Sequence, residues 1–293
     1  MSATMLADVT NQVKTFWSSL FTDEVMETAV LPALMNRQYE GEIQPGGSTV
    51  KITQFNRPTA TRRTVGDRHD TFDTNVLGTT QVSLTADQVI TAAFEFDSLV
   101  QLQSQVRDAD SQIRKGLVEA AMIEVNKLCY SIVAPSSSAP DMVDSGVSDF
   151  NATQLLAQRL KASQQKWAQN NRYMLVDPSY MNDLLAAQTL TSSDYAGDDA
   201  PVLNGKMLKQ RFGFWIVEDN TEGMSQLSPT SATADLALGL DPSFAALVLS
   251  APEFEISSLH SQKRHGFIMS VKYIAGAALL PAGTSRHLKV YNS

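Results

Sequence analysis

Cysteine is almost absent from this chain of 293 residues. The single cysteine, Cys129, cannot form an internal disulfide, so nothing supports a secreted, disulfide-stapled protein, and the chain is typical of a reducing cytoplasm. Cys129 stands beside an apolar stripe of a predicted helix, which favours a small buried hydrophobe over a reactive thiol.

Basic charge and long apolar runs are also scarce. There are 23 Lys and Arg against 31 Asp and Glu, which gives a formal net charge of −8 and a pI near 5.0. Such a surface repels polyanions, which argues against sequence-specific nucleic-acid binding. No window reaches the 18 apolar residues of a membrane span, and no basic region followed by an apolar block opens the chain. The apolar content of 43% still suffices for one large domain or two ordinary ones.

Patterns that carry chemistry are missing as well. The histidines do not stand at metal-ligand spacings, and there is no nucleophile elbow and no phosphate-binding glycine loop. The charged set Asp67-Arg68-His69-Asp70 is interpreted as a solvated tip or a contact surface, and the acidic loop containing Asp194, Asp198 and Asp199 as a solvated loop. The sequence therefore predicts no catalytic residue, no metal site and no cofactor. The four histidines that lack metal-ligand spacing are His69, His260, His265 and His287.

The longest periodic stretch is Phe96–Ala134. Its apolar residues recur in steps of three and four, the period of one helix face, and no proline interrupts it. Asp97 or Ser98 is suited to cap the first turn, and Pro135 ends the pattern. The stretch predicts one helix about 50 Å long, which can serve as a spine. The residues expected on its buried face are Leu102, Val106, Ile113, Leu117 and Val125.

The segment Leu6–Leu34 has a helical pattern unlike that of a domain core. One apolar face runs through Phe16, beside Trp17, and Pro32 is expected to bend or end a second helix. Because helices this short are marginal alone, we expect an arm that packs outside its own compact body on a neighbouring copy, with Phe16 and Trp17 in contact.

Two alternating stretches, Ser48–Thr53 and Gln81–Leu84, predict the strands of a hairpin, and Val89–Phe96 predicts a further strand that leads into the spine helix. The hairpin tip is basic. A two-stranded hairpin is barely stable by itself, so we expect it to lie across an adjacent copy, where its arginines meet carboxylates. The inter-subunit arginines expected are Arg57, Arg62, Arg63 and Arg68, and acidic residues available elsewhere include Asp108, Asp110, Glu119 and Glu124.

After a loop at Ser136–Ser148, helices and strands alternate as in an α/β module. The sequence predicts a helix marked by Leu155, Leu156, Leu160 and Trp167. A short buried strand at Tyr173–Val176 and a helix at Pro178–Ala187 follow it, and Thr191–Gly205 and Asn220–Asp235 are predicted to be loops. Further strands are expected at Phe214–Val217, Phe244–Leu249, Phe254–Ser258, Phe267–Ile274 and His287–Tyr291.

An arm, a projecting hairpin, a rod-like helix and a compact module are typical of a self-assembling protein whose projections are stable on neighbouring copies. Three phrases look like coat-protein signatures. They are Asn36–Ile43 running into Pro45–Ile52, Val176–Tyr180 followed by Leu184 and Leu185, and Gly205–Lys206 to Gly213–Asn220. In these phrases and in the order of its elements, the sequence resembles the tailed-phage major capsid (coat) proteins of the Hong Kong 97-type fold over nearly its whole length.

The resemblance implies an α+β fold of five parts. These are an N-arm at residues 1–41, an extended E-loop β-hairpin at 42–85, a P-domain with the spine helix at 86–149, an α/β A-domain at 150–250, and closing strands shared between the A- and P-domains at 251–293.

The resemblance also implies a structural, non-enzymatic protein of the virion. Such proteins assemble through hexamers and pentamers into the icosahedral head of a tailed double-stranded DNA phage, in the host bacterial cytoplasm. Some members cross-link their subunits through a lysine and an asparagine, but no position here matches that pair. The partners implied are copies of the chain itself, a portal, a decoration or cement protein where the phage has one, and packaged DNA contacted non-specifically, with no membrane. A scaffold is expected to be a separate protein, unless an N-terminal extension was cleaved, because the arm pattern starts within the first ten residues.

Two alternatives remain open at this point. An encapsulin-type nanocompartment shell protein shares the fold and would enclose a cargo enzyme. A soluble α/β enzyme would have its site near Asp177, His260 or His265, although the sequence offers no nucleophile and base pair for it.

Overall fold

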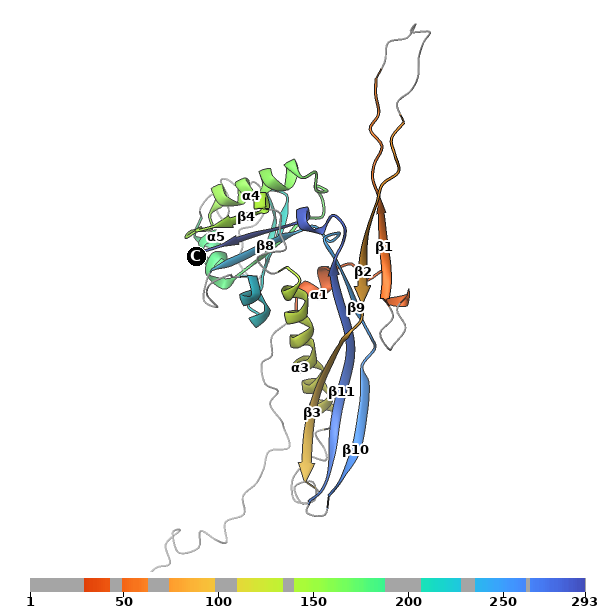
Figure 1. The fold of residues 1–293 in the computed structure, drawn as a ribbon. Helices are drawn as coiled ribbons and strands as arrows, with labels where there is room; N and C mark the ends of the chain where they lie inside the picture. Colours follow the sequence, from red (N-terminus) through yellow and green to blue (C-terminus); the bar gives the residue numbers. More distant parts are fainter. Residues whose placement is uncertain are drawn as a thin grey trace, which may run out of the picture.

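The structure is a computed structural model that describes residues 29–42, 49–62, 74–97, 110–133, 140–187, 207–227, 235–261 and 264–292. Figure 1 shows three parts: a compact module, a long narrow sheet with a helix beside it, and a hairpin that projects beyond the end of that sheet nearest the module. Within these residues, no helix has the length and apolar character needed to cross a membrane.

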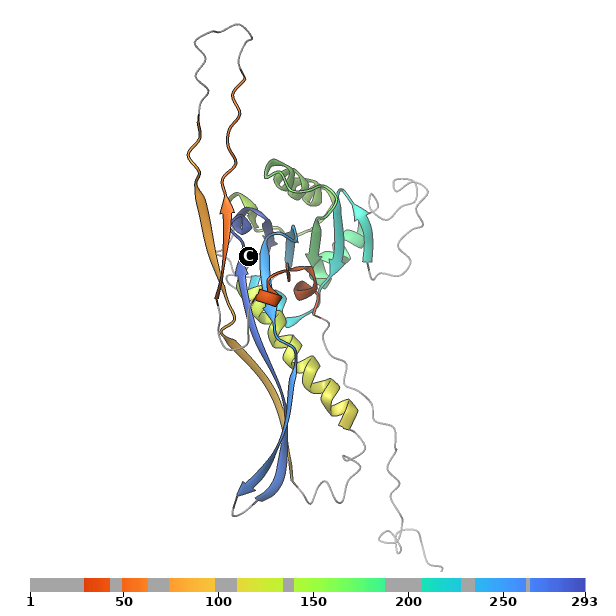
Figure 2. The same cartoon turned by 90° about the vertical axis from the view of Figure 1, so that its right-hand side faces the viewer.

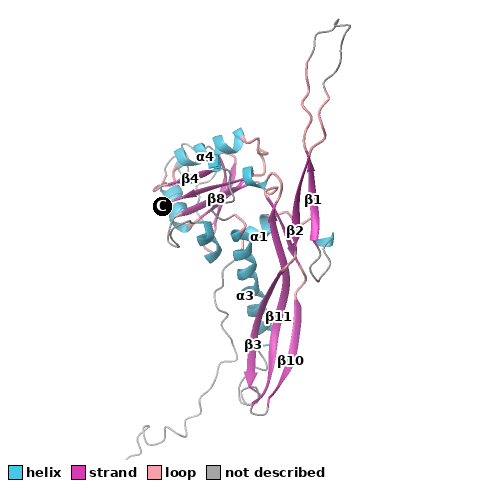
Figure 3. Cartoon of the chain, viewed as in Figure 1, coloured by secondary structure: helices cyan, strands magenta, loops and turns pink. Residues whose placement is uncertain are grey.

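The compact module is built on a six-stranded mixed sheet with the strand order β4-β12-β8-β5-β7-β6. Figure 3 colours its strands magenta and labels β4 and β8. The strands are β4 (Val143–Ser145), β5 (Tyr173–Val176), β6 (Met207–Arg211), β7 (Phe214–Glu218), β8 (Leu236–Leu240) and β12 (His287–Tyr291). The module also contains the helices α4 (Ala152–Gln164) and α5 (Pro178–Ala186), and the 3-10 turns Pro140–Met142 and Gly283–Ser285.

Local capping defines where both helices of this module begin. The Asn151 side chain accepts hydrogen bonds from the amides of Thr153 and Gln154 at the start of α4. Asp177 accepts from the Ser179 amide, 2.7 Å away, at the start of α5, where Pro178 occupies the first turn as predicted.

The predicted apolar face of α4 is only partly right. Leu155 is buried, whereas Leu156 and Leu160 are exposed, and Trp167 lies beyond the helix end and is buried. Two loop assignments are also wrong, because β4 lies inside Ser136–Ser148 and a 3-10 helix, Glu222–Leu227, lies inside Asn220–Asp235. Both elements are short and polar, so they lack the periodicity that sequence analysis requires.

The second sheet is long and antiparallel. Its central strand β11 (Arg264–Leu279) pairs with β10 (Glu253–Ser261), β3 (Gln88–Asp97) and β9 (Ala245–Leu249). Helix α3 (Asp110–Ser131) covers one face, where Leu117 and Ala121 pack against Met269, Val271 and Tyr273 of β11 (Figure 2). Alternate residues of β11 therefore form part of the core.

The predicted spine helix is wrong at its start. Phe96 and Asp97 belong to β3, so Asp97 cannot cap a helix, and the described helix begins at Asp110. A helix of 22 residues is about 33 Å long rather than about 50 Å. Near Phe96 the sequence fits both the strand alternation of Val89–Phe96 and the helical period that follows. Phe96 and Asp97 belong to the strand because they pair with Phe267 and Gly266 of β11. Leu117 and Val125 are buried as predicted and Ile113 is half-buried, while Leu102 and Val106 lie outside the described residues.

The end of the predicted arm belongs to the body of its own chain. Leu31 and Met35 are buried in one apolar cluster with Val125, Cys129 and Phe244. Asn36 exchanges backbone hydrogen bonds with Ala245 and Leu247 beside β9. The prediction that all of Leu6–Leu34 packs outside this body is thus wrong for its last residues. Pro32 opens the short helix α1 (Leu31–Leu34) rather than ending a helix, since a proline fits the first turn.

Helix α3 also contacts the compact module. The Tyr130 hydroxyl donates a hydrogen bond to the buried carboxylate of Asp219, and the Asn126 amide donates to the Thr221 hydroxyl at 2.8 Å. These buried polar contacts fix the 3-10 helix Glu222–Leu227 and the end of β7 on the helix, so the long sheet and the module share one core.

Candidate assembly surface: the projecting hairpin and its base

The projecting hairpin consists of β1 (Thr49–Phe55) and β2 (Thr79–Thr85), which pair antiparallel in a register that aligns Thr49 with Thr85 and Phe55 with Thr79. The pairing predicted from the two alternating stretches is confirmed. An additional 3-10 turn, Glu40–Glu42, precedes the hairpin.

The two faces of this ribbon differ. Ile52 and Leu84 are buried and form an apolar cluster with Ala246 and Val248 of β9, against which Ile274 of β11 also packs. The opposite face carries Thr49, Lys51, Thr53 and Phe55 of β1, all of them exposed. The hairpin is therefore attached to its own chain by one face at its base only.

At this base, two backbones come close together. A Cβ atom built on Gly276 of β11 would lie 2.1 Å from the Thr85 carbonyl oxygen and 2.8 Å from the Cα of Ala86. Any side chain at this position would push the end of β2 away from the sheet. The absence of a side chain at Gly276 thus allows the end of β2 to pack directly on β11, which determines the position of the hairpin on the long sheet.

Beyond the strands, side-chain amides hold the two arms together. Asn56 accepts a hydrogen bond from the Gly78 amide at 2.7 Å and donates to the Val76 carbonyl at 3.2 Å. Farther out, the Asn75 amide donates to the Thr59 carbonyl at 3.1 Å. These contacts continue the ribbon past the point where regular strand pairing ends.

Of the residues predicted to contact another subunit, Arg57 and Arg62 are described, and both are exposed on the first arm. Arg63, Arg68, Phe16 and Trp17 lie outside the described residues. Their role in assembly remains a prediction.

Sequence analysis missed an apolar group on the hairpin. Phe55, Val76 and Leu77 are exposed to 59%, 87% and 70%, next to the Asn56 hydrogen bonds. The sequence held one sign of this group, because the strand alternation places Phe55 on the same face of the ribbon as the polar residues Lys51 and Thr53. Large apolar side chains gathered on a thin ribbon are typical of a protein contact.

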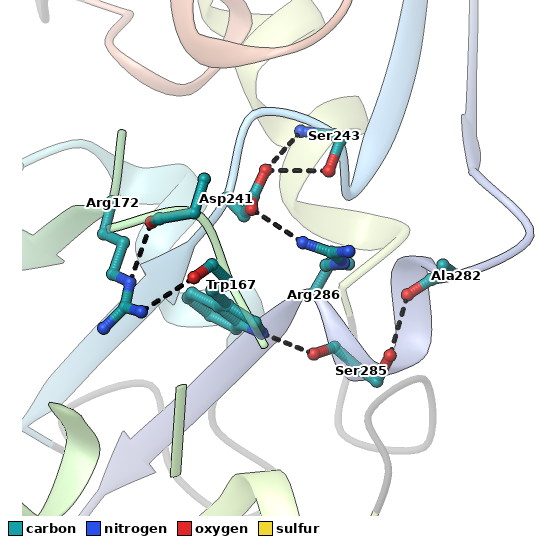
Figure 4. A network of polar contacts seen from close by, with 8 residues as sticks. Trp167, Arg172, Asp241, Ser243, Ala282, Ser285 and Arg286 are labelled. Carbon is teal, nitrogen blue, oxygen red and sulfur yellow. Dashed lines mark hydrogen bonds and ion pairs between the residues drawn. The ribbon is translucent and has the colours of Figure 1, made fainter. Parts of the chain in front are cut away.

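A second polar network joins the compact module to the start of β9 (Figure 4). The Arg286 guanidinium donates to Asp241 at 2.9 Å, and the same carboxylate accepts from the Ser243 amide and hydroxyl. The Trp167 indole donates to the Ser285 carbonyl at 2.7 Å, and Arg172 donates to the Trp167 carbonyl at 2.8 Å. The network holds the connection between the two sheets.

Buried titratable groups near these contacts have structural roles. Burial lowers the pKa of His287 to about 4, so its ring is neutral near pH 7, hydrogen-bonded through Nδ1 to the Gly283 carbonyl. Burial raises the pKa of the Cys129 thiol to about 12, which agrees with its prediction as a buried hydrophobe.

The residues of the enzyme alternative do not come together. Asp177 caps α5 in the compact module, whereas His260 and His265 are backbone partners in the register of β10 and β11, in the long sheet. Among the residues that the structure describes, no cluster of His, Cys, Asp and Glu is suited to hold a metal ion.

Comparison with known proteins relates the chain to phage structures. No protein-family model and no curated protein matches its sequence. A chain from Mycobacterium phage Che8 is 20% identical, with a TM-score of 0.71 over 95% of this chain and 96% of that chain. The capsid of the cyanophage P-SCSP1u is 12% identical, with a TM-score of 0.73 over 97% and 94%. The mature capsid of bacteriophage PhiM1 is 14% identical, with a TM-score of 0.66 over 95% and 91%.

This chain has the Hong Kong 97-type phage capsid fold. The match extends over nearly the full length of both chains in each comparison, so it includes the hairpin and the long sheet as well as the compact module. The α+β fold predicted from the sequence is confirmed.

Proposed function

We propose that this protein is a major capsid protein that assembles through hexamers and pentamers into the icosahedral head of a tailed phage. The observation that carries the proposal is the near-complete coverage of phage capsid chains. Its place is then the virion, its role is structural rather than enzymatic, and its principal partner is a second copy of itself.

The hairpin gives independent physical support. Ordering a backbone residue costs about 1–2 kcal/mol, and beyond the base the arms have no core to offset this cost. Exposed Phe55, Val76 and Leu77 add an unfavourable apolar surface. Contact with an adjacent copy removes both problems, and a closed shell repeats the contact in every subunit.

The proposed division of the chain follows the capsid fold. It comprises an N-arm at residues 1–41, an E-loop at 42–85, a P-domain at 86–149, an A-domain at 150–250 and shared closing strands at 251–293. Further partners belong to the same proposal: a separate scaffolding protein, a portal, a decoration protein where one exists, and non-specific contact with packaged DNA.

Negative-stain electron microscopy of the purified full chain tests the proposal. Large closed shells or their hexameric and pentameric precursors are expected. A monodisperse small oligomer with no shell at any protein or salt concentration would contradict it. Small closed shells that enclose a cargo enzyme would instead establish the encapsulin-type alternative.

A further inference from the structure

Helix α4 carries large apolar side chains on its outer face. Leu155, Gln158 and Ala162 form the buried face of the helix. Leu156 and Leu160, one turn apart, are exposed to 43% and 60%. Among the helices that the structure describes, no other exposes a large apolar side chain. Figures 1 and 2 show α4 on the side of the compact module away from α3.

The same face of α4 is basic. Residues 150–172, which contain α4, include four basic residues and no acidic residue, in a chain with a formal net charge of −8. Of the four, Lys161 pairs with Asp144 at 2.6 Å. Arg159 and Lys166 are exposed, and the part of the chain that the structure describes offers them no ion pair. The outer face therefore combines two leucines with two uncompensated cations.

A buried arginine adds to the positive charge at the end of α4. Arg172 is 2% exposed, and its hydrogen bonds within the described residues go to the Trp167 and Ala168 carbonyls and the Ser163 hydroxyl (Figure 4). None of these acceptors is a carboxylate. Burial and, to a smaller extent, the positive charge of Arg159 lower the pKa of Arg172, so the two guanidinium groups lie near each other. A negatively charged partner at this end of α4 would reduce their repulsion.

Lys166 has an unusual backbone conformation for its residue type. It follows the end of α4 with a φ of 57°, in the left-handed region where helices commonly end on glycine. Its amide donates to the Ser163 carbonyl at 3.0 Å, which satisfies one of the last carbonyls of the helix. The helix end therefore needs only the backbone of Lys166, and the exposed ammonium group is available to a partner.

A second copy of this chain is poorly suited to cover the outer face of α4. Pairing of α4 with α4 would bring Arg159 and Lys166 against the same cations of the other copy. The other described helices expose no large apolar side chain that could pack on Leu156 and Leu160. The exposed apolar residues of the hairpin, such as Phe55, lie on segments 49–62 and 74–85, which contain no acidic residue.

We propose that the outer face of α4 is a docking site for an acidic amphipathic helix of another protein. Leu156 and Leu160 pack between apolar side chains of that helix spaced three or four residues apart, because ridges at this spacing fit the grooves of a second helix. Arg159 and Lys166 meet its carboxylates at the rim, where charge governs partner choice and orientation. The inference goes beyond the proposed capsid function, since the partner is not a copy of the chain.

Binding of designed peptides to the purified full chain tests the site. The probe is a fluorescent helical peptide of about 20 residues with leucines along one face and glutamates beside them. A matched peptide carries lysine in place of every glutamate. Fluorescence anisotropy at moderate salt should show saturable binding of the glutamate peptide and binding of the lysine peptide that is weaker by roughly tenfold or more.

Two variants of the chain test which residues bind the peptide. Leu156→Ser with Leu160→Ser should weaken binding of the glutamate peptide by roughly tenfold or more, because two apolar side chains no longer become buried in the complex. Arg159→Glu with Lys166→Glu should reverse the preference between the glutamate and lysine peptides.

Two controls separate docking from folding and from net charge. Lys166→Gly should weaken binding of the glutamate peptide by roughly twofold to fivefold, the effect of one exposed ion pair. Its thermal unfolding temperature should be unchanged or higher, since glycine favours the backbone conformation at this position. Arg57→Glu with Arg62→Glu on the hairpin changes the net charge as much as the α4 charge variant and should alter neither affinity.

Three results would overturn the docking site. They are the absence of any preference for the glutamate peptide, an unchanged affinity in the leucine variant, and loss of self-assembly by the leucine variant with unchanged thermal unfolding. The last result would make a second copy of the chain the occupant of this face. Shell formation by the wild-type chain is measured separately, so the docking site and the capsid function can fail independently.

Discussion

Gly276 and Thr85 form the closest backbone approach at the base of the hairpin, where a Cβ on the glycine would lie 2.1 Å from the threonine carbonyl oxygen. The residues are far apart in sequence and lie in different sheets, the hairpin and the long sheet. Their contact holds the end of β2 against β11, so the hairpin projects from a defined position on the long sheet.

Substitution of Gly276 should therefore displace the hairpin. Gly276→Val is expected to disrupt shells, and to lower the free energy of unfolding by about 1–3 kcal/mol, because the Thr85 backbone must move. Thermal unfolding and sedimentation measure the two effects. Gly116→Ala is the control, since a Cβ at this position in α3 meets nothing within 4 Å and alanine favours helix. Equal assembly by both variants would contradict the proposed role of the close approach.

Asn56 is expected to stabilise the extended arms. Asn56→Asp keeps the acceptor for the Gly78 amide but loses the donor to Val76, whereas Asn56→Ala loses both. Each lost hydrogen bond at this exposed site is worth about 0.5–1.5 kcal/mol. Hydrogen exchange at the Gly78 amide should accelerate strongly in the alanine variant and weakly in the aspartate variant. Identical exchange in all three chains would argue against this hydrogen bond.

Tyr130 links α3 to the module through Asp219. Tyr130→Phe removes a donor to a buried carboxylate, and the free energy of unfolding should fall by about 1–3 kcal/mol in urea titration. A double-mutant cycle with Asp219→Asn isolates the pair, and a favourable coupling energy is expected. Additive effects of the two substitutions would mean that the contact contributes nothing.

Leu117 tests the buried face of α3. Leu117→Asp places a charge among Met269, Val271 and Tyr273, at a cost of several kcal/mol, and should give insoluble protein. Leu117→Met should remain soluble and assemble because it conserves volume. Soluble, assembling Leu117→Asp protein would refute the assignment of this face.

The buried ring of His287 predicts sensitivity to acid. Its pKa in the folded chain is about 4, below the ordinary value of 6.5, so the unfolded chain binds more protons between these values. Stability from this group is complete above pH 6.5 and is lost as the pH falls toward 4, by about 3 kcal/mol. Urea unfolding of unassembled protein at pH 7, 5.5 and 4 measures the loss. His287→Gln should show a shallower decline, and an equally steep one would exclude His287 as the cause.

The sequence by itself determined the elements with strong local patterns. The alternation of apolar and polar residues predicted β1 and β2, and the proline after Asp177 predicted the start of α5. In each case, residues close together in sequence are sufficient to define the element. The basic arm residues and the capsid fold were also evident from the sequence, the latter through the order of the elements.

Only the tertiary structure decided where neighbouring patterns end and which faces meet. Phe96 and Asp97 fit both a strand and a helix, and pairing with β11 placed them in the strand. The sequence pattern assigned Leu31 to an arm outside the body, but in the structure Leu31 is buried in the same apolar cluster as residues of α3 and Phe244. The close approach of Gly276 to Thr85 arises from the packing of strands distant in sequence, and no local period records such a contact.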